Sequence, residues 1–169
     1  MLLAFCNELD GRAITEFNYR LHSRKAANIF VGVRTPQGVD ELSILIKRLA
    51  DTGYSVADLS HDEMAKLHVR YMVGGAPVNQ LKEHLYSFEF PEQPNALIKF
   101  LNMLGTHANI TLFHYRNHGA AYGQVLAGFE LADGEIAAFT EHLNALGYDY
   151  KDETNNLSYR FFLSQSEHH

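Results

Sequence analysis

The chain has 169 residues, 46% of them hydrophobic, which is enough to bury a core. Its formal net charge of −6 disfavours a nucleic-acid partner, because phosphate-binding proteins usually gather Lys and Arg on one face. The sequence has no apolar run of about 20 residues and no charged-then-apolar leader. Its single cysteine, Cys6, can make no internal disulfide. These features predict a soluble, cytoplasmic chain with no membrane or nucleic-acid partner.

A short stretch of the sequence occurs twice. The pair Tyr19-Arg20 in "ITEFNYRLHS" recurs as Tyr115-Arg116 in "ITLFHYRNHG", 96 positions further on. This spacing is too long for a solenoid repeat, but it suits two copies of a small domain.

The second copy has the clearer pattern of elements. Alternating apolar residues predict strands, and apolar residues at helical spacing predict helices. In chain order we expect a strand over 85–90, a helix over 95–105, strands over 109–116 and 122–131, a helix over 133–147 and a short strand over 148–152. This βαββαβ order is that of a ferredoxin-like unit.

The first copy follows the same order without its first strand. We expect a helix over 2–9, strands over 14–22 and 27–34, a helix over 40–52 and a last strand in "YSVADLS". Each copy then carries an extension, "DEMAKLHVRYMV" or "DETNNLSYRFFL", in which we expect a short turn and another strand. The chain is therefore predicted to be an α+β protein with two tandem subdomains, 1–75 and 76–165, cut from a longer protein. Residues 166–169, "SEHH", look like a tag remnant.

The missing strand has a structural consequence. The first strand of a βαββαβ sheet usually lies between the third and the fourth, so its loss predicts a vacancy inside the sheet. A second copy of the chain, a collapse of the flanking strands, or the alternating segment Leu67–Val73 could fill it. We favour the second copy and so predict a homo-oligomer that associates through the first subdomain.

Catalytic and metal motifs are missing from the sequence. There is no P-loop, no G-x-S-x-G and no G-x-G-x-x-G motif, and Cys6 lies among apolar helix residues, where a buried side chain is expected. His114 and His118 do not share a helical face, and His168 and His169 fall in the tag remnant. We predict no metal site, no cofactor and no catalytic residue in this chain.

The leucines at 97, 101 and 104 fall on one face of a predicted helix. Such a stripe is typical of a core, although it could also form the wall of an aliphatic ligand pocket. The Tyr-Arg pairs likewise have two interpretations, strand packing or ligand binding. Duplication favours binding, since two similar domains set side by side create two similar sites.

Several longer motifs resemble one known family. "FPEQPNALIKFLNMLGTHANITLF" is similar to ACT-like domains that sense amino acids. Together with "TEFNYR", "FVGVR", "GYSVADLSHDEMAKLHVRYMVGG", "LYSFEFPE", "LGTHANITLFHYRNHG", "GYDYKDETNN" and "RFFL", it resembles the carboxy-terminal regulatory region of biosynthetic threonine deaminase (threonine ammonia-lyase). The resemblance covers nearly the whole chain.

This resemblance implies two ACT-like subdomains that bind isoleucine as a feedback inhibitor and valine as an activator. It implies a pyridoxal-phosphate (PLP) catalytic domain in the absent part of the same parent chain, and a role in isoleucine biosynthesis. Tyr19 and Tyr115 match the effector-site tyrosines of the family. Arg12, Leu97, Leu101 and Leu104 match positions linked to feedback inhibition.

Two other functions remain open from the sequence. A stand-alone amino-acid sensor would have the same motifs. A ferredoxin-like RNA-binding module would also place aromatic residues and arginines on strands, as "FHYR" and "YRFFL" do, but the negative charge and the lack of an RNP1 motif disfavour it.

Overall fold

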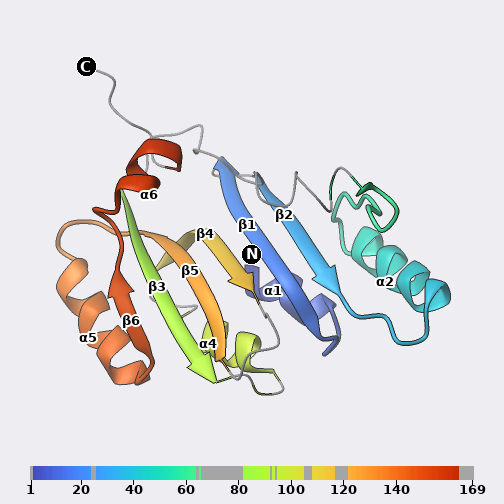
Figure 1. Ribbon diagram of the computed structural model, residues 1–169, viewed down its shortest axis with the longest axis horizontal. Coiled ribbons are helices and arrows are strands. Elements are labelled where there is room, and N and C mark those ends of the chain that lie inside the picture. Colours follow the sequence, from blue (N-terminus) through green and yellow to red (C-terminus); the bar gives the residue numbers. More distant parts are fainter. Residues whose placement is uncertain are drawn as a thin grey trace.

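The computed structural model describes residues 2–23, 26–63, 65, 82–91, 93, 95–104, 108–116 and 122–163. In chain order the elements are α1 (Leu2–Glu8), β1 (Ile14–Ser23), β2 (Ala26–Val33), α2 (Val39–Asp51), β3 (Glu83–Pro91), α4 (Ala96–Leu104), β4 (Asn109–Arg116), β5 (Tyr122–Glu130), α5 (Ile136–Leu146), β6 (Asp149–Asp152) and α6 (Leu157–Phe162). The strands form one antiparallel sheet with the order β2-β1-β4-β5-β3-β6 (Figure 1).

The second repeat has the predicted ferredoxin-like topology. Its elements β3, α4, β4, β5, α5 and β6 follow the βαββαβ order, and its strands lie side by side as β4-β5-β3-β6. The first strand of the unit, β3, therefore lies between the third and the fourth, as the sequence predicted. The α+β class and the tandem arrangement are confirmed.

The two repeats join edge to edge through their equivalent strands, β1 and β4. Phe17 pairs with Tyr115, and Tyr19 pairs with Phe113. Because residues 17 and 113 are equivalent, as are 19 and 115, this register is symmetric about the central pair of Asn18 and His114. A local pseudo-twofold axis therefore relates the repeats within one continuous sheet.

One face of the sheet carries the main hydrophobic core. Helices α1, α2, α4 and α5 all contribute buried residues to this core, and α1 contacts α4. Aromatic contacts cross the repeat junction, with the Phe17 and Phe113 rings 6.3 Å apart and Phe5 of α1 5.8 Å from Phe17. The two repeats consequently share one core, which suits units too small to be stable separately.

The end of the first repeat differs from the prediction. Residues 54–59 form no strand, and β2 is the edge strand of the sheet within the described residues. The prediction of a vacancy inside the sheet is therefore wrong. The equivalent strand of the second repeat, β6, pairs with β3. The first repeat has no described counterpart of β3, so residues 54–59 have no strand to pair with. The segment Leu67–Val73 and the predicted boundary at residue 75 lie outside the described residues.

The extension of the second repeat also differs from the prediction, since α6 stands where a strand was expected. Tyr159 and Leu163 are four residues apart and therefore lie on one helical face. They pack on Leu85 and Leu112, on the face of the sheet opposite to the main core. The helical spacing of these two apolar residues outweighed the strand propensity of the short aromatic run "YRFF".

The buried thiol of Cys6 gives a prediction about pH. Cys6 is 1% exposed, and burial raises its pKa from 9.0 to about 12. The unfolded thiol therefore loses its proton first, so the contribution of Cys6 to stability is complete below pH 9 and is lost as the pH rises toward 12. Iodoacetamide should alkylate the native chain at pH 8 more slowly than the unfolded chain by at least about a hundredfold. A native rate close to the unfolded rate would contradict this burial. Cys6→Ala should flatten the decline in unfolding free energy across the same pH range.

Candidate functional site

The two tyrosines expected to bind an effector lie on the helix-covered face of the sheet. Tyr19 and Tyr115 are each 4% exposed, and they occupy symmetric positions on the neighbouring strands β1 and β4. Burial raises the pKa of Tyr19, so the phenol stays protonated at neutral pH. Each tyrosine also brings a hydroxyl group, which can donate and accept hydrogen bonds, to a cluster of otherwise apolar residues.

The leucine stripe lies in the same core as these tyrosines. Leu97, Leu101 and Leu104 of α4 are all buried there. The same spacing as in the buried set Leu97, Phe100, Leu101 and Leu104 recurs in α1 and the residue that follows it, at Leu2, Phe5, Cys6 and Leu9. Helices α1 and α4 are thus equivalent but not identical, because Cys6 stands at the position of Leu101.

Arg12 is anchored elsewhere, between α1 and α2. Its Nε donates to Glu41 Oε1 at 2.9 Å, and its Nη1 donates to the Leu9 carbonyl oxygen at 3.1 Å. Glu41 lies in the first turn of α2. Arg12 therefore ties the turn after α1 to α2, whereas the other five predicted residues lie in the hydrophobic core cluster.

On the opposite face, the arginine that follows Tyr19 is part of a buried ionic network. Arg20 is 2% exposed, and its Nη1 donates to Glu83 Oε1 at 2.5 Å. Its Nη2 donates to Glu83 Oε2 at 3.3 Å and to the Leu163 carbonyl oxygen at 2.7 Å. Thr111 Oγ1 also donates a hydrogen bond to Glu83, and the Tyr159 hydroxyl donates one to Glu83 Oε2 at 2.6 Å. This network connects the first repeat to β3, β4 and the end of α6.

The side chains in the network sit close to Gly128 of β5. A Cβ atom at this position would lie 2.8 Å from Glu83 Oε1 and 2.9 Å from Thr111 Oγ1. Burial, the hydrogen bond to Glu83 and the charge of that carboxylate together raise the pKa of Tyr159. The cluster therefore holds a carboxylate tightly, and an added methyl group would displace it.

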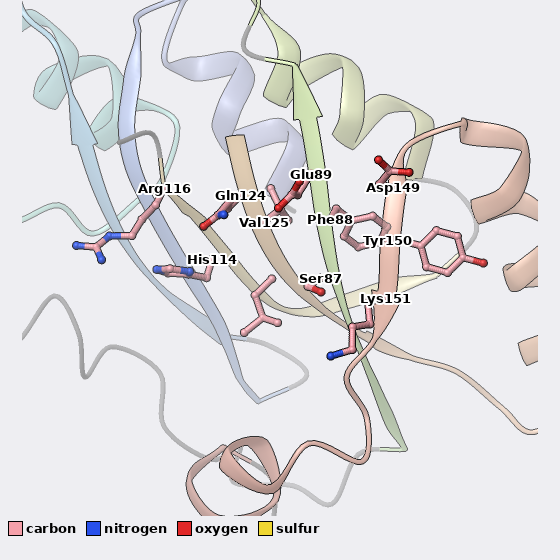
Figure 2. Close-up of a pocket in the computed structure, with 11 residues that line it drawn as sticks. Ser87, Phe88, Glu89, His114, Arg116, Gln124, Val125, Asp149, Tyr150 and Lys151 are labelled. Atoms are coloured by element: carbon pink, nitrogen blue, oxygen red, sulfur yellow. The ribbon is translucent and has the colours of Figure 1, made fainter. Parts of the chain in front are cut away.

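Beyond α6, the same face of the sheet forms an open groove of about 620 Å³ (Figure 2). The strand register aligns Arg116, Gln124, Glu89 and Asp149 across four strands, so that cationic, neutral and acidic side chains follow one another. Ser87 and Leu126 occupy the neighbouring row. The groove therefore combines charged and polar side chains with apolar ones, whereas the leucine stripe was expected to form a purely aliphatic pocket.

Sequence reasoning found Arg116 in this groove only through the repeated Tyr-Arg pair. His114 lies on the same strand as Arg116, but most of the other lining residues come from strands that are distant in the sequence, and no motif links them to this pair. Glu83, the acceptor at the centre of the buried network, was also missed, because a lone glutamate before a strand normally indicates a solvated position.

Among the described residues, no group of three or more His, Cys, Asp and Glu side chains could hold a metal ion. No helix in the described ranges is long and apolar enough to cross a membrane.

Comparison with known proteins places this fold in a family. The family model for the C-terminal regulatory domain of threonine dehydratase matches residues 1–69 and 74–163. The chain belongs to this family. It is 62% identical over 162 residues to the L-threonine dehydratase biosynthetic IlvA of Escherichia coli K12, a match that covers 96% of this chain and 31% of the relative.

Two further relatives agree. The L-threonine dehydratase biosynthetic IlvA of Salmonella typhimurium LT2 is also 62% identical over 162 residues, with 96% of this chain and 31% of the relative covered. The mitochondrial threonine dehydratase of Saccharomyces cerevisiae is 41% identical over 160 residues, with 90% of this chain and 28% of the relative covered. The regulatory domain described here therefore spans less than a third of the length of these curated relatives.

The buried network of this regulatory domain gives a prediction about stability. Glu83→Leu should lower the free energy of unfolding by about 3–5 kcal/mol, because it leaves the Arg20 charge buried without its carboxylate. Adding Arg20→Met should recover part of this loss, so that the double variant is more stable than the sum of the single effects implies. Guanidinium unfolding of the four chains would measure the coupling.

The adjacent lysine supplies a matched control. Lys82 pairs with Asp133 at 3.1 Å, but both side chains are exposed. Lys82→Ala should change the unfolding free energy by less than about 1 kcal/mol. Equal effects of Glu83→Leu and Lys82→Ala would show that the network contributes no more than a surface ion pair.

Proposed function

We propose that this domain is the effector-sensing part of a biosynthetic threonine dehydratase (threonine ammonia-lyase), and that it binds isoleucine as inhibitor and valine as activator. The observation that carries the proposal is the placement of Tyr19 and Tyr115 at symmetric positions in one apolar core. Two polar hydroxyls inside such a core suit the recognition of an aliphatic amino acid, because the ligand needs both hydrogen bonds and apolar contact.

The tyrosine side of the sheet offers the chemistry that such ligands require. The leucine stripe of Leu97, Leu101 and Leu104 can pack on a branched side chain, while a phenol can donate to a carboxylate or accept from an ammonium group. Isoleucine and valine differ by one methylene, worth about 0.8 kcal/mol of burial. That margin is small enough for the two amino acids to compete. We assign Arg12 a positioning role, because it links the turn after α1 to α2.

The two sites should be unequal. Cys6 of α1 corresponds to Leu101 of α4, so the side of the core that α1 covers has less aliphatic bulk. A smaller side chain changes the volume left for a ligand and the strength of its dispersion contacts. We therefore expect one tyrosine to matter more than the other for a given effector.

We further propose that the lyase reaction and its PLP cofactor belong to another part of a longer parent chain in the isoleucine pathway. The four described lysines, at positions 47, 82, 99 and 151, are all exposed. A Schiff-base lysine instead needs a pocket that shields it and positions the cofactor. The described residues therefore do not fit PLP, and we expect the domain alone not to deaminate threonine.

Three organisational features also belong to this proposal. The repeats are assigned to residues 1–75 and 76–165, the parent protein to the cytoplasm, and the assembled state to a homo-oligomer. Static light scattering of the domain at micromolar concentration would test the last of these, since a monomer would contradict it.

Titration calorimetry with isoleucine, valine and threonine tests effector binding directly. We expect isoleucine and valine to bind and to raise the melting temperature, because a ligand that binds the native state stabilises it by mass action. Tyr19→Phe and Tyr115→Phe should weaken isoleucine binding unequally, the larger effect being about three- to tenfold for one lost hydrogen bond. These variants keep the aromatic ring and so preserve the core.

Tyr122→Phe is the matched control, because Tyr122 is 58% exposed at the start of β5. Its affinity for isoleucine should equal that of the parent chain. If Tyr19→Phe and Tyr115→Phe also bound isoleucine like the parent, the two tyrosines would be packing residues. Absence of any binding to a folded domain at millimolar isoleucine would contradict effector sensing by this domain.

A further inference from the structure

A line of alternating charges fastens α1 to α2 in the first repeat. Arg48 of α2 donates through its Nε to Glu8 Oε2 at 3.0 Å, and its Nη1 lies 3.3 Å from Asp10 Oδ2. Asp10 Oδ2 also lies 3.9 Å from Nη1 of Arg12, which donates to Glu41. Acids and bases therefore alternate along one connected line, which we call the ionic clasp: Glu8, Arg48, Asp10, Arg12 and Glu41.

The backbone of α2 and of the turn after α1 brings these side chains into line. Glu41 and Arg48 are seven residues apart on α2, so they share one face of the helix. Asp10 has a positive φ of 56°, a conformation that is costly for most residues and that aspartate tolerates. The turn with this conformation ends α1 and holds the Asp10 carboxylate between two guanidinium groups.

The helix pair of the second repeat lacks the residues for such a clasp. Its equivalent of Arg48 is His142, whose Nε2 donates to the main-chain carbonyl oxygen of Met103 at 2.8 Å. Met103 stands in the place of Glu8, and a glycine stands in the place of Asp10. Helix α4 contains no Asp or Glu. Where the first repeat has a line of charges, α4 and α5 are thus joined through a carbonyl group of the main chain.

The ring contacts of the two helices, in contrast, are alike. Phe5 of α1 meets the ring of Tyr54 at 5.2 Å, and Phe100 of α4 meets the ring of Tyr148 at 5.7 Å, both edge to face. Burial raises the pKa of Tyr54, and the negative charge of Glu8 adds to this effect, so the clasp lies beside the ring contact. Because the ring contacts match, the polar contacts distinguish how α1 and α4 are held.

We propose that the ionic clasp sets the affinity of the effector site at Tyr19, with Arg48 as its central positioning residue. Phe5 of α1 packs on Phe17, which lies two residues from Tyr19 on the same face of β1. Tyr19 is buried, so a ligand reaches it only when α1 moves, and the clasp opposes that movement. The free energy of opening is subtracted from the affinity of the site. This inference rests on the proposed function, because it concerns how an effector reaches Tyr19.

Exposure divides the clasp into two parts. The side chains of Arg48 and Glu8 are 41% and 27% exposed, whereas those of Arg12 and Glu41 are 16% and 13% exposed. Dissolved salt therefore screens the pairs of Arg48 more than the pair of Arg12. A single exposed pair contributes little, but Arg48 joins two carboxylates in a network. Salt should thus loosen α1 through Arg48 and leave the Arg12 pair in place.

Hydrogen exchange of the α1 amides tests the clasp without any ligand. Raising NaCl from about 0.01 to about 1 M shortens the Debye length from about 30 to about 3 Å. We expect α1 to exchange about two- to fivefold faster at the higher concentration, and α4 to respond less. Arg48→Met should exchange at the fast rate at both concentrations, because it keeps an apolar stem and loses the charge. Arg48→Lys should regain part of the salt response, since an ammonium group can still pair with one carboxylate.

Lys47→Met is the matched control on the same helix. Lys47 pairs with Asp51 at 2.7 Å, an ion pair within α2 itself. Its loss should leave the exchange of α1 and the salt response unchanged. Equal effects of Lys47→Met and Arg48→Met would attribute the response to the net charge of α2 and overturn the proposal. Exchange of α1 in the parent chain that is independent of salt would overturn it as well.

An isoleucine titration followed by the same exchange measurement connects the clasp to the effector site. The isoleucine concentration that gives half of the change in α1 exchange should be about two- to fivefold lower at high salt than at low salt. It should be lower by the same factor in Arg48→Met at low salt, and the corresponding concentration for α4 should change less. A larger change for α4 than for α1 would assign the effect to the other site and overturn the proposal.

Failure of the clasp and failure of the proposed function give different results. If isoleucine binds but the exchange of α1 follows neither salt nor Arg48→Met, the clasp is refuted and effector sensing stands. If the exchange of α1 follows both but no isoleucine binds, effector sensing is contradicted, and with it the role of the clasp in effector affinity.

Discussion

The interaction on which the arrangement of the repeats depends is the buried carboxylate of Glu83. A carboxylate inside a protein is costly unless hydrogen-bond donors surround it. Here donors come from Arg20 of β1, Thr111 of β4 and Tyr159 of α6. These residues belong to both repeats, so the charge is satisfied only when the repeats have joined and α6 has docked. The cost of an unpaired charge therefore disfavours other ways of assembling the same elements.

The same network fixes the register at the repeat junction. Tyr19 and Arg20 are consecutive on a strand and so point to opposite faces of the sheet. A slip of one residue between β1 and β4 would turn Arg20 into the hydrophobic core and Tyr19 toward the polar face. Shared apolar packing on one side and the ion pair on the other thus favour the same register. This agreement explains how two short strands can join two small domains without a long interface.

Much of this architecture could be predicted from the sequence because its signals are local. The alternation of apolar and polar residues predicted the strands, and the repeat at a spacing of 96 residues predicted the two subdomains. Asn95 adopts a positive φ of 62° just before α4, a conformation that asparagine tolerates better than most residues. The two elements predicted wrongly depend on contacts that are distant in the sequence. Residues 54–59 would need a strand partner from elsewhere, and α6 depends on the apolar surface that Leu85 and Leu112 provide.

The candidate site was only partly predictable for the same reason. The repeat drew attention to Tyr19 and Tyr115, but nothing in their local sequence indicates that they share one core across a strand junction. Nor does the local sequence separate Arg12, whose hydrogen bonds to Glu41 and to the Leu9 carbonyl group depend on α2 lying beside the turn after α1. Residues on one strand can be ordered from sequence, whereas the meeting of two strands is set by the whole fold.

The burial of the two tyrosines also sets a condition on effector binding. Each tyrosine is only 4% exposed, so the proposed ligand would reach them only if the packing of the helices over β1 and β4 changed. The free energy needed for that opening is subtracted from the affinity, so the measured affinity depends on how readily the helices separate. Because α1 and α4 contact each other across the pseudo-twofold axis, opening over one tyrosine alters the support of the other. Under the proposed function, two effectors that act through these tyrosines would be coupled through the helix pair, even though the sheet beneath is held by Glu83.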